Sequence, residues 1–198
     1  MMTPIFNNGH GGMINGIYQT PGKRSPEWDL GVLYEGMFNR WFINRLIERF
    51  DRCGYKYYHA CPELTDVPLW QRVARANKIY QKDKNVYYFS LHANAGGGVG
   101  IEGFTSPGLT KSDPVAEMFL ANLEKDFKGT QIMRFDITDG DRDKEAKFKE
   151  LLDTHCPAFL LECGFMDHRE DYKKLWSEDY LNKMVDSVFT TMEYLYTN

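Results

Sequence analysis

The sequence predicts an α/β fold in which helices cover both faces of a mostly parallel, twisted central sheet. Short aromatic and β-branched runs of strand length alternate along the chain with longer stretches in which apolar residues recur at helical spacing. The 198 residues, 42% hydrophobic and 26% charged, suit a single globular domain. No repeat, low-complexity tract or linker interrupts the chain, so we place no domain boundary within residues 1–198.

The predicted strands end at polar residues. The first surrounds Ile5 and Phe6 and ends near Asn7, and the run YKYYHA at residues 55–60 predicts the second. The run VYYFSLH predicts a strand over residues 86–92, and AFLLE predicts another over 158–162. In an open α/β sheet, functional residues are expected where such strands end and loops begin.

Helical patterns fill the intervals between these strands. Gly54 ends a helix within residues 34–54, Asp66 is expected to cap a second helix with Pro68 in its first turn, and Ser112 and Pro114 open a third. The apolar stripe of the last helix consists of Leu181, Met184, Val185, Val188, Met192 and Leu195. The alternation of these helices with the strands predicts the layered architecture.

Composition excludes several classes of protein. Lys and Arg number 24 against 28 Asp and Glu, and no basic block marks a nucleic-acid surface. No apolar run approaches the ~20 residues of a membrane helix, and the N-terminus lacks a signal-peptide pattern, so we expect synthesis in the cytoplasm. The cysteines lack C-x-x-C spacing and are expected to be reduced and mostly buried: Cys53, Cys61, Cys156 and Cys163.

Candidate functional residues lie at the ends of the predicted elements. His10 follows the first strand, His92 and Glu162 each close a strand, and Glu35 begins a helix, where the helix dipole favours a carboxylate. Two histidines and a carboxylate match a catalytic zinc site, and a further carboxylate near it, Glu162, suits proton transfer from water. Each residue taken singly also fits a structural role. That role is the expected one for the other histidines: His59, His155 and His168.

Four segments in order resemble the signature of the zinc-dependent N-acetylmuramoyl-L-alanine amidases, the family often called amidase type 3. They are NNGHGG, YEGMFNR, FSLHANA and FLLECGFMDHREDYKKL, and WQRVARAN resembles the family's helix before the H-x-N strand. The likeness spans nearly the whole chain. Any one motif would be weak, but four motifs in order on the expected elements make a specific signal.

The resemblance implies that His10, Glu35 and His92 bind Zn²⁺ and that Glu162 is the catalytic carboxylate. It also implies hydrolysis of the amide between N-acetylmuramic acid and L-alanine in peptidoglycan. Asn94, which lies two residues beyond a ligand, is a weaker candidate for substrate contact. Were Glu162 not the base, Glu102 would be the nearest alternative carboxylate in sequence to the H-x-N strand.

Several functions fit this resemblance. The first is a wall-degrading amidase, most naturally a phage or prophage endolysin without a separate cell-wall-binding domain, which reaches the bacterial wall after release from the cytoplasm. The alternatives are a zinc peptidase of the same fold, a bacterial wall-remodelling amidase, and a wall-binding module without activity. We expect a monomer whose partner is peptidoglycan and not nucleic acid.

Two departures from the family pattern bear on the site. Cys163 follows Glu162, and alternation along the strand predicts that its thiol points into the core. The segment 13–34 is longer than expected and is predicted to form a loop beside the cleft. Its Tyr18 and Trp28 either stack on substrate or anchor the loop.

Overall fold

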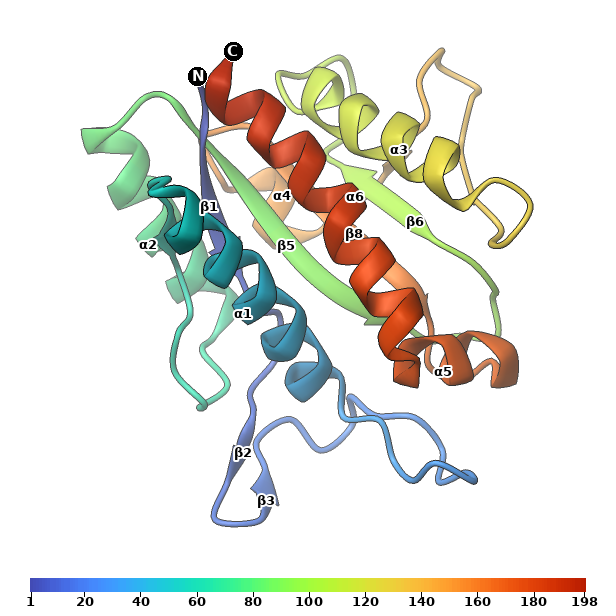
Figure 1. Cartoon of the computed structure of the whole chain (residues 1–198). Coiled ribbons are helices and arrows are strands. Elements are labelled where there is room, and N and C mark those ends of the chain that lie inside the picture. Colours follow the sequence, from blue (N-terminus) through green and yellow to red (C-terminus); the bar gives the residue numbers. More distant parts are fainter.

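A computed structural model describes all 198 residues and confirms the α/β fold with its mostly parallel sheet (Figure 1). The six strands are ordered β4-β1-β5-β8-β6-β7. Their bounds are β1 Thr3–Asn7, β4 Tyr58–His59, β5 Val86–Asn94, β6 Glu102–Thr105, β7 Lys144–Glu145 and β8 Ala158–Phe165. The pairs β1–β4, β1–β5, β5–β8 and β6–β7 are parallel, and only β6 and β8 pair antiparallel within this sheet.

Helices cover both faces of the sheet. The larger core lies under three helices, α1 Glu35–Cys53, α3 Asp113–Phe127 and α6 Glu178–Thr197, which lie in front of the sheet in Figure 1. A smaller core on the other face is covered by α2 Leu69–Lys82 and α4 Lys149–Leu152. The short α5 Arg169–Trp176 follows β8, and a small hairpin pairs β2 Met13–Ile14 with β3 Ile17–Tyr18. None of the helices combines the length and apolar character needed to cross a membrane.

Side-chain alternation divides the two central strands between these cores. Phe89, Leu91 and Cys163 belong to the larger core, whereas Tyr88 and Leu160 belong to the smaller one. The thiol of Cys163 is fully buried, as alternation predicts, and burial raises its pKa well above the usual range. The same face of β5 that carries Tyr88 therefore carries the polar residues at its carboxyl end.

The predicted strand at 55–60 is wrong in length, because only Tyr58 and His59 pair with β1. The aromatic rings of Tyr55 and Tyr57 instead pack at right angles to Phe50 of α1. The aromatic residues of this segment therefore pack in the core and do not lengthen the strand.

The predicted cap of α2 is also wrong, since the helix begins after Pro68 and Asp66 makes no cap hydrogen bond. The carboxylate of Asp66 instead accepts hydrogen bonds from Arg72 at 2.8 Å and from the Thr20 hydroxyl at 2.8 Å. Asp66 thus ties α2 to the loop after β3. The third helix does follow Ser112, with Pro114 in its first turn.

The N-terminus of α1 packs directly on the glycine-rich loop that follows β1. An added Cβ at Gly36 would lie 1.9 Å from the carbonyl oxygen of Gly11. The backbone N–H of Gly36 donates to the Tyr18 hydroxyl at 2.8 Å, so a third segment joins the same contact. This contact joins the start of α1, the loop after β1 and the β2–β3 hairpin.

Gly36→Ala should destabilise the protein, because its methyl group would overlap the Gly11 carbonyl. Overpacking of this kind costs about 1–3 kcal/mol in the free energy of unfolding, measured by urea denaturation. Gly22→Ala is the matched control: nothing lies within 4 Å of its added Cβ, and we expect a change below about 0.5 kcal/mol. Equal stability of the two variants would contradict the close approach.

Candidate functional site

The structure brings His10, Glu35 and His92 together from three separate elements. His10 lies in the loop after β1, Glu35 is the first residue of α1, and His92 lies near the carboxyl end of β5. One potential ligand atom from each residue falls within 4.8 Å of the others, and these three form the one group of this kind in the chain. The arrangement can hold a metal ion.

Glu35 stands between the two histidines. Its Oε1 lies 3.3 Å from Nε2 of His10 and 2.8 Å from Nδ1 of His92. Burial alone would raise the pKa of Glu35, but the adjacent imidazoles of His10 and His92 hold it well below its usual range. Nε2 of His10 is buried and has no hydrogen-bond partner, so its lone pair or proton is unsatisfied within the protein.

The position before His10 requires glycine. Gly9 has a φ of +69°, and an added Cβ there would lie 2.4 Å from Nδ2 of Asn39 and 2.9 Å from Cε1 of His92. Only glycine combines this left-handed backbone with so close an approach to a ring. The loop can therefore bring His10 close to His92, with 5.2 Å between the ring centroids.

The second ring nitrogen of His92 faces a buried polar cluster. Nε2 lies 3.1 Å from Oγ of Ser90 and 3.5 Å from Oε1 of Glu150, a residue of the short helix α4. Burial lowers the pKa of His92, but the carboxylates of Glu150 and Glu35 outweigh it and raise this pKa to about 10. Glu150 carries no sequence signal of its own, because nothing in KFKELL distinguishes this glutamate from the charged residues beside it.

Glu162 lies beside the three-residue group, on the next strand of the sheet. It is the parallel register partner of His92, so the two side chains leave the same face. Oε2 of Glu162 is buried without a hydrogen-bond partner. Burial raises the pKa of Glu162 to about 8, which places its proton exchange near neutral pH.

Glu102 is the antiparallel partner of Glu162 on β6, yet its carboxylate is fully engaged. Oε1 accepts hydrogen bonds from Arg134 and, at 2.6 Å, from Lys144, while Oε2 accepts one at 2.7 Å from Nδ2 of Asn94. Glu102 and Glu162, which are neighbours across the β6–β8 pair, therefore differ in their hydrogen bonding. Glu102 is held as an ion-paired carboxylate, whereas Glu162 has an oxygen available for a proton.

The two aromatic residues of the 13–34 segment anchor that segment. The Tyr18 hydroxyl donates to the carbonyl of Lys23 at 3.0 Å, and this side chain is 8% exposed. Trp28 packs edge-on against Tyr172 with 4.8 Å between ring centroids, and the Arg169 guanidinium lies over its ring. These contacts account for both side chains as packing elements.

The histidines expected to be structural lie outside the group that can hold a metal: His59, His155 and His168. His59 is partly buried, and burial lowers its pKa to about 4, with the positive charge of Arg40 acting in the same direction. This ring is therefore neutral at physiological pH. Because His59 lies outside the candidate site, its substitution can serve as a control.

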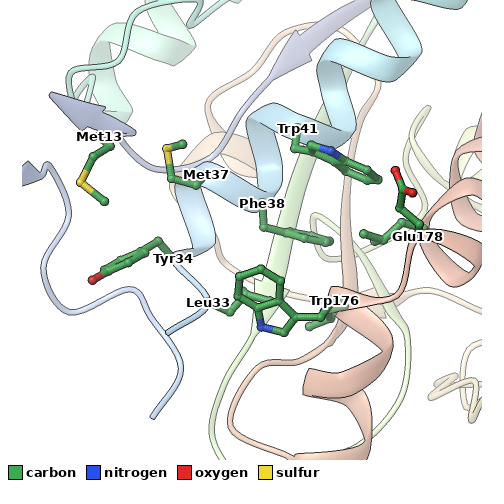
Figure 2. A pocket seen from close by; sticks show the side chains of 10 residues that line it. Met13, Leu33, Tyr34, Met37, Phe38, Trp41, Trp176 and Glu178 are labelled. Carbon is green, nitrogen blue, oxygen red and sulfur yellow. The ribbon is translucent and has the colours of Figure 1, made fainter. Parts of the chain in front are cut away.

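A separate apolar groove of about 440 Å³ lies along α1. Figure 2 shows Phe38 and Trp41 of α1 projecting toward Trp176 of α5. Nine of its ten lining residues are hydrophobic, and none belongs to the His10, Glu35 and His92 group. The groove and the polar site are therefore distinct surfaces of the molecule.

Known proteins resemble this chain in both sequence and fold. N-acetylmuramoyl-L-alanine amidase CwlM of Bacillus licheniformis is 33% identical over 119 residues, which cover 60% of this chain and 42% of that protein. The chain thus matches about two fifths of the length of this curated relative. The crystal structure of N-acetylmuramoyl-L-alanine amidase from Clostridium difficile 630 matches with a TM-score of 0.75 at 21% identity, covering 100% of this chain and 98% of that one.

A further solved structure with the same fold is the catalytic domain of an endolysin targeting Clostridia difficile. Its TM-score is 0.63 at 22% identity, and the match covers 96% of this chain and 98% of that one. The family model described as N-acetylmuramoyl-L-alanine amidase matches residues 5–194. This match takes in every residue of the site and nearly the whole chain, and the protein therefore belongs to the N-acetylmuramoyl-L-alanine amidase family.

Proposed function

We propose that this protein hydrolyses the amide between N-acetylmuramic acid and L-alanine in peptidoglycan, with Zn²⁺ held by His10, Glu35 and His92. The observation that carries the proposal is the gathering of these three side chains beside Glu162. Family membership supplies the substrate class, and the site supplies the chemistry.

The residues present fit a zinc ion. Two nitrogen ligands and one carboxylate oxygen form a common donor set for catalytic zinc, which leaves one position for water or substrate. Oε1 of Glu35 lies 3.3 Å from Nε2 of His10 and 2.8 Å from Nδ1 of His92, so all three atoms could contribute to one ion. Nε2 of His10 is buried and has no hydrogen-bond partner within the protein, as suits a nitrogen that would bind the ion.

Zinc, when bound, supplies a Lewis acid that polarises the scissile carbonyl and acidifies water. Glu162 then accepts a proton from the attacking water at Oε2, the oxygen without a partner. The same carboxyl group delivers this proton to the nitrogen of the departing L-alanine, so the carboxylate is regenerated. The buried position of Glu162 and its unpartnered Oε2 suit both halves of this transfer.

The substrate must also be oriented, and Asn94 is a candidate for this contact. One amide N–H of Asn94 donates to Glu102, and its carbonyl accepts from the backbone N–H of Ala95 at 2.8 Å. A second N–H and a second lone pair are uncommitted. Asn94 follows His92 on the same strand, so these groups lie near the proposed metal.

We also propose a lytic role, in which the enzyme cuts enough stem peptides to open the wall. The fold shared with an endolysin catalytic domain supports this role, and the same fold occurs in a bacterial amidase. A lytic enzyme and a wall-remodelling enzyme would cut the same amide bond and differ in how many of these bonds they cut.

Purified sacculi digested with the zinc-loaded protein should release intact stem peptides with free L-alanine amino termini, detected by mass spectrometry. Turbidity of cells with an accessible wall should fall in parallel if the role is lytic. Products cut within the stem would identify a zinc peptidase and contradict the amidase reaction. Extensive cleavage of isolated sacculi without lysis of cells would contradict the lytic role.

His92→Ala should lose zinc and activity together, because it removes one of the three proposed ligands, a side chain with 7% exposure. Metal content after gel filtration and turnover of sacculi measure the two effects. His59→Ala is the matched control and should keep both, since His59 lies outside the group. Full zinc occupancy in His92→Ala would show that the ligand assignment is wrong.

Glu162→Gln should separate catalysis from metal binding. Glutamine keeps the size of the side chain but cannot accept the proton, so turnover should fall on the order of 10²–10⁴-fold. Zinc content should equal that of the wild type. Glu102→Gln, on the neighbouring strand, should retain far more activity, because both oxygens of Glu102 already accept hydrogen bonds. A larger loss of activity in Glu102→Gln than in Glu162→Gln would reverse the assignment.

A further inference from the structure

A buried carboxylate lies directly behind His92, on the side away from the proposed metal. Oε2 of Glu150 accepts hydrogen bonds from Asn7 at 3.0 Å, from the Tyr88 hydroxyl at 3.1 Å and from the Ser90 hydroxyl at 3.2 Å. Its other oxygen, Oε1, lies 3.5 Å from Nε2 of His92. Glu150 is only 4% exposed, so a carboxylate there needs these donors to remain charged.

The hydrogen bonds of Ser90 determine which nitrogen of His92 carries a proton. A serine hydroxyl has one hydrogen, and Ser90 donates it to Glu150. Oγ of Ser90 also accepts a hydrogen bond from Nδ2 of Asn7 at 2.8 Å. Toward Nε2 of His92, 3.1 Å away, the hydroxyl can therefore only accept.

Both neighbours of Nε2 are thus acceptors, since an ionised Glu150 has no hydrogen to donate. Nε2 of His92 therefore carries a proton that faces them. Nδ1 lies 2.8 Å from Oε1 of Glu35, which is also an acceptor, so without a metal the ring carries a proton on each nitrogen. The Nδ1 proton, within the three-residue group, is the one that a bound metal would replace.

We infer that Glu150, acting with Ser90, is a positioning residue that fixes the tautomer and ring orientation of His92, so that Nδ1 is its metal-binding atom. The inference rests on the proposed zinc site. Carboxylates that accept the second N–H of a ligating histidine hold the ring in place and increase its basicity. Glu150 never touches the metal or the substrate and acts through His92 alone.

Zinc binding by the metal-free protein tests this role without any substrate. Glu150→Gln keeps the shape of the side chain but can present an N–H to Nε2, which removes the preference for one tautomer. Its zinc affinity, measured by competition with a chelator, should fall about 10–100-fold. Nitrogen NMR of the zinc-loaded wild type should show His92 protonated at Nε2, and the signal of this proton should weaken or shift in the variant.

Asp171→Asn is the matched control. Asp171 is also a buried carboxylate, 1% exposed, but it accepts hydrogen bonds from the backbone N–H groups of Gly100 and Phe165, away from the ligands. This variant should lower the melting temperature of the metal-free protein and leave zinc affinity unchanged. A structural role for Glu150 would make the two variants behave alike.

Ser90→Ala provides a second test if Glu150→Gln does not fold. It removes one acceptor of the Nε2 proton and should weaken zinc binding by a smaller factor than the loss of the carboxylate. Zinc affinities within twofold of the wild type in the folded variants, or zinc bound to Nε2 of His92, would overturn the inference. Zinc retained by His92→Ala would instead overturn the proposed metal site itself, so the two failures are distinguishable.

Discussion

The site depends on the parallel register between β5 and β8. His92 and Glu162 are direct partners in this ladder, so a proposed metal ligand and a proposed proton acceptor leave one face of the sheet side by side. A slip of β8 by one residue would turn Glu162 toward the larger core and separate it from His92. The apolar residues that precede His92 on β5 and Glu162 on β8 are buried. This hydrophobic pattern maintains the register that brings the two side chains together.

Three buried carboxylates around His92 have different properties because their partners differ. Glu35 and Glu150 both face the imidazole, and its hydrogen bonds and positive charge lower their pKa values against the effect of burial. Glu162 has no such hydrogen bond, so burial dominates and raises its pKa. Partner geometry, more than residue type, therefore separates charged supporting groups from a group suited to proton exchange.

Much of this arrangement was predictable because strand ends are visible in a sequence. Polar residues after aromatic and β-branched runs indicated His92 and Glu162, and the helix start indicated Glu35. Tyr55 and Tyr57 were misleading, since aromatic residues serve core packing as well as strands. The role of Glu150 was not visible at all: it depends on contacts across more than 50 residues of sequence, such as that to His92, which local patterns do not record.

Two glycines explain how His10 and Glu35 reach this edge of the sheet. Gly9 allows the loop to pass against the His92 ring, and Gly36 allows the first turn of α1 to rest on the same loop. The loop carries His10 and the helix begins with Glu35, so one backbone contact sets the distance between these two side chains. Side-chain packing can tolerate small changes in volume, but a contact between two backbones has no rotamer with which to adjust. Strand register therefore places His92 and Glu162, the glycine contacts place His10 and Glu35, and the four side chains meet at one edge of the sheet.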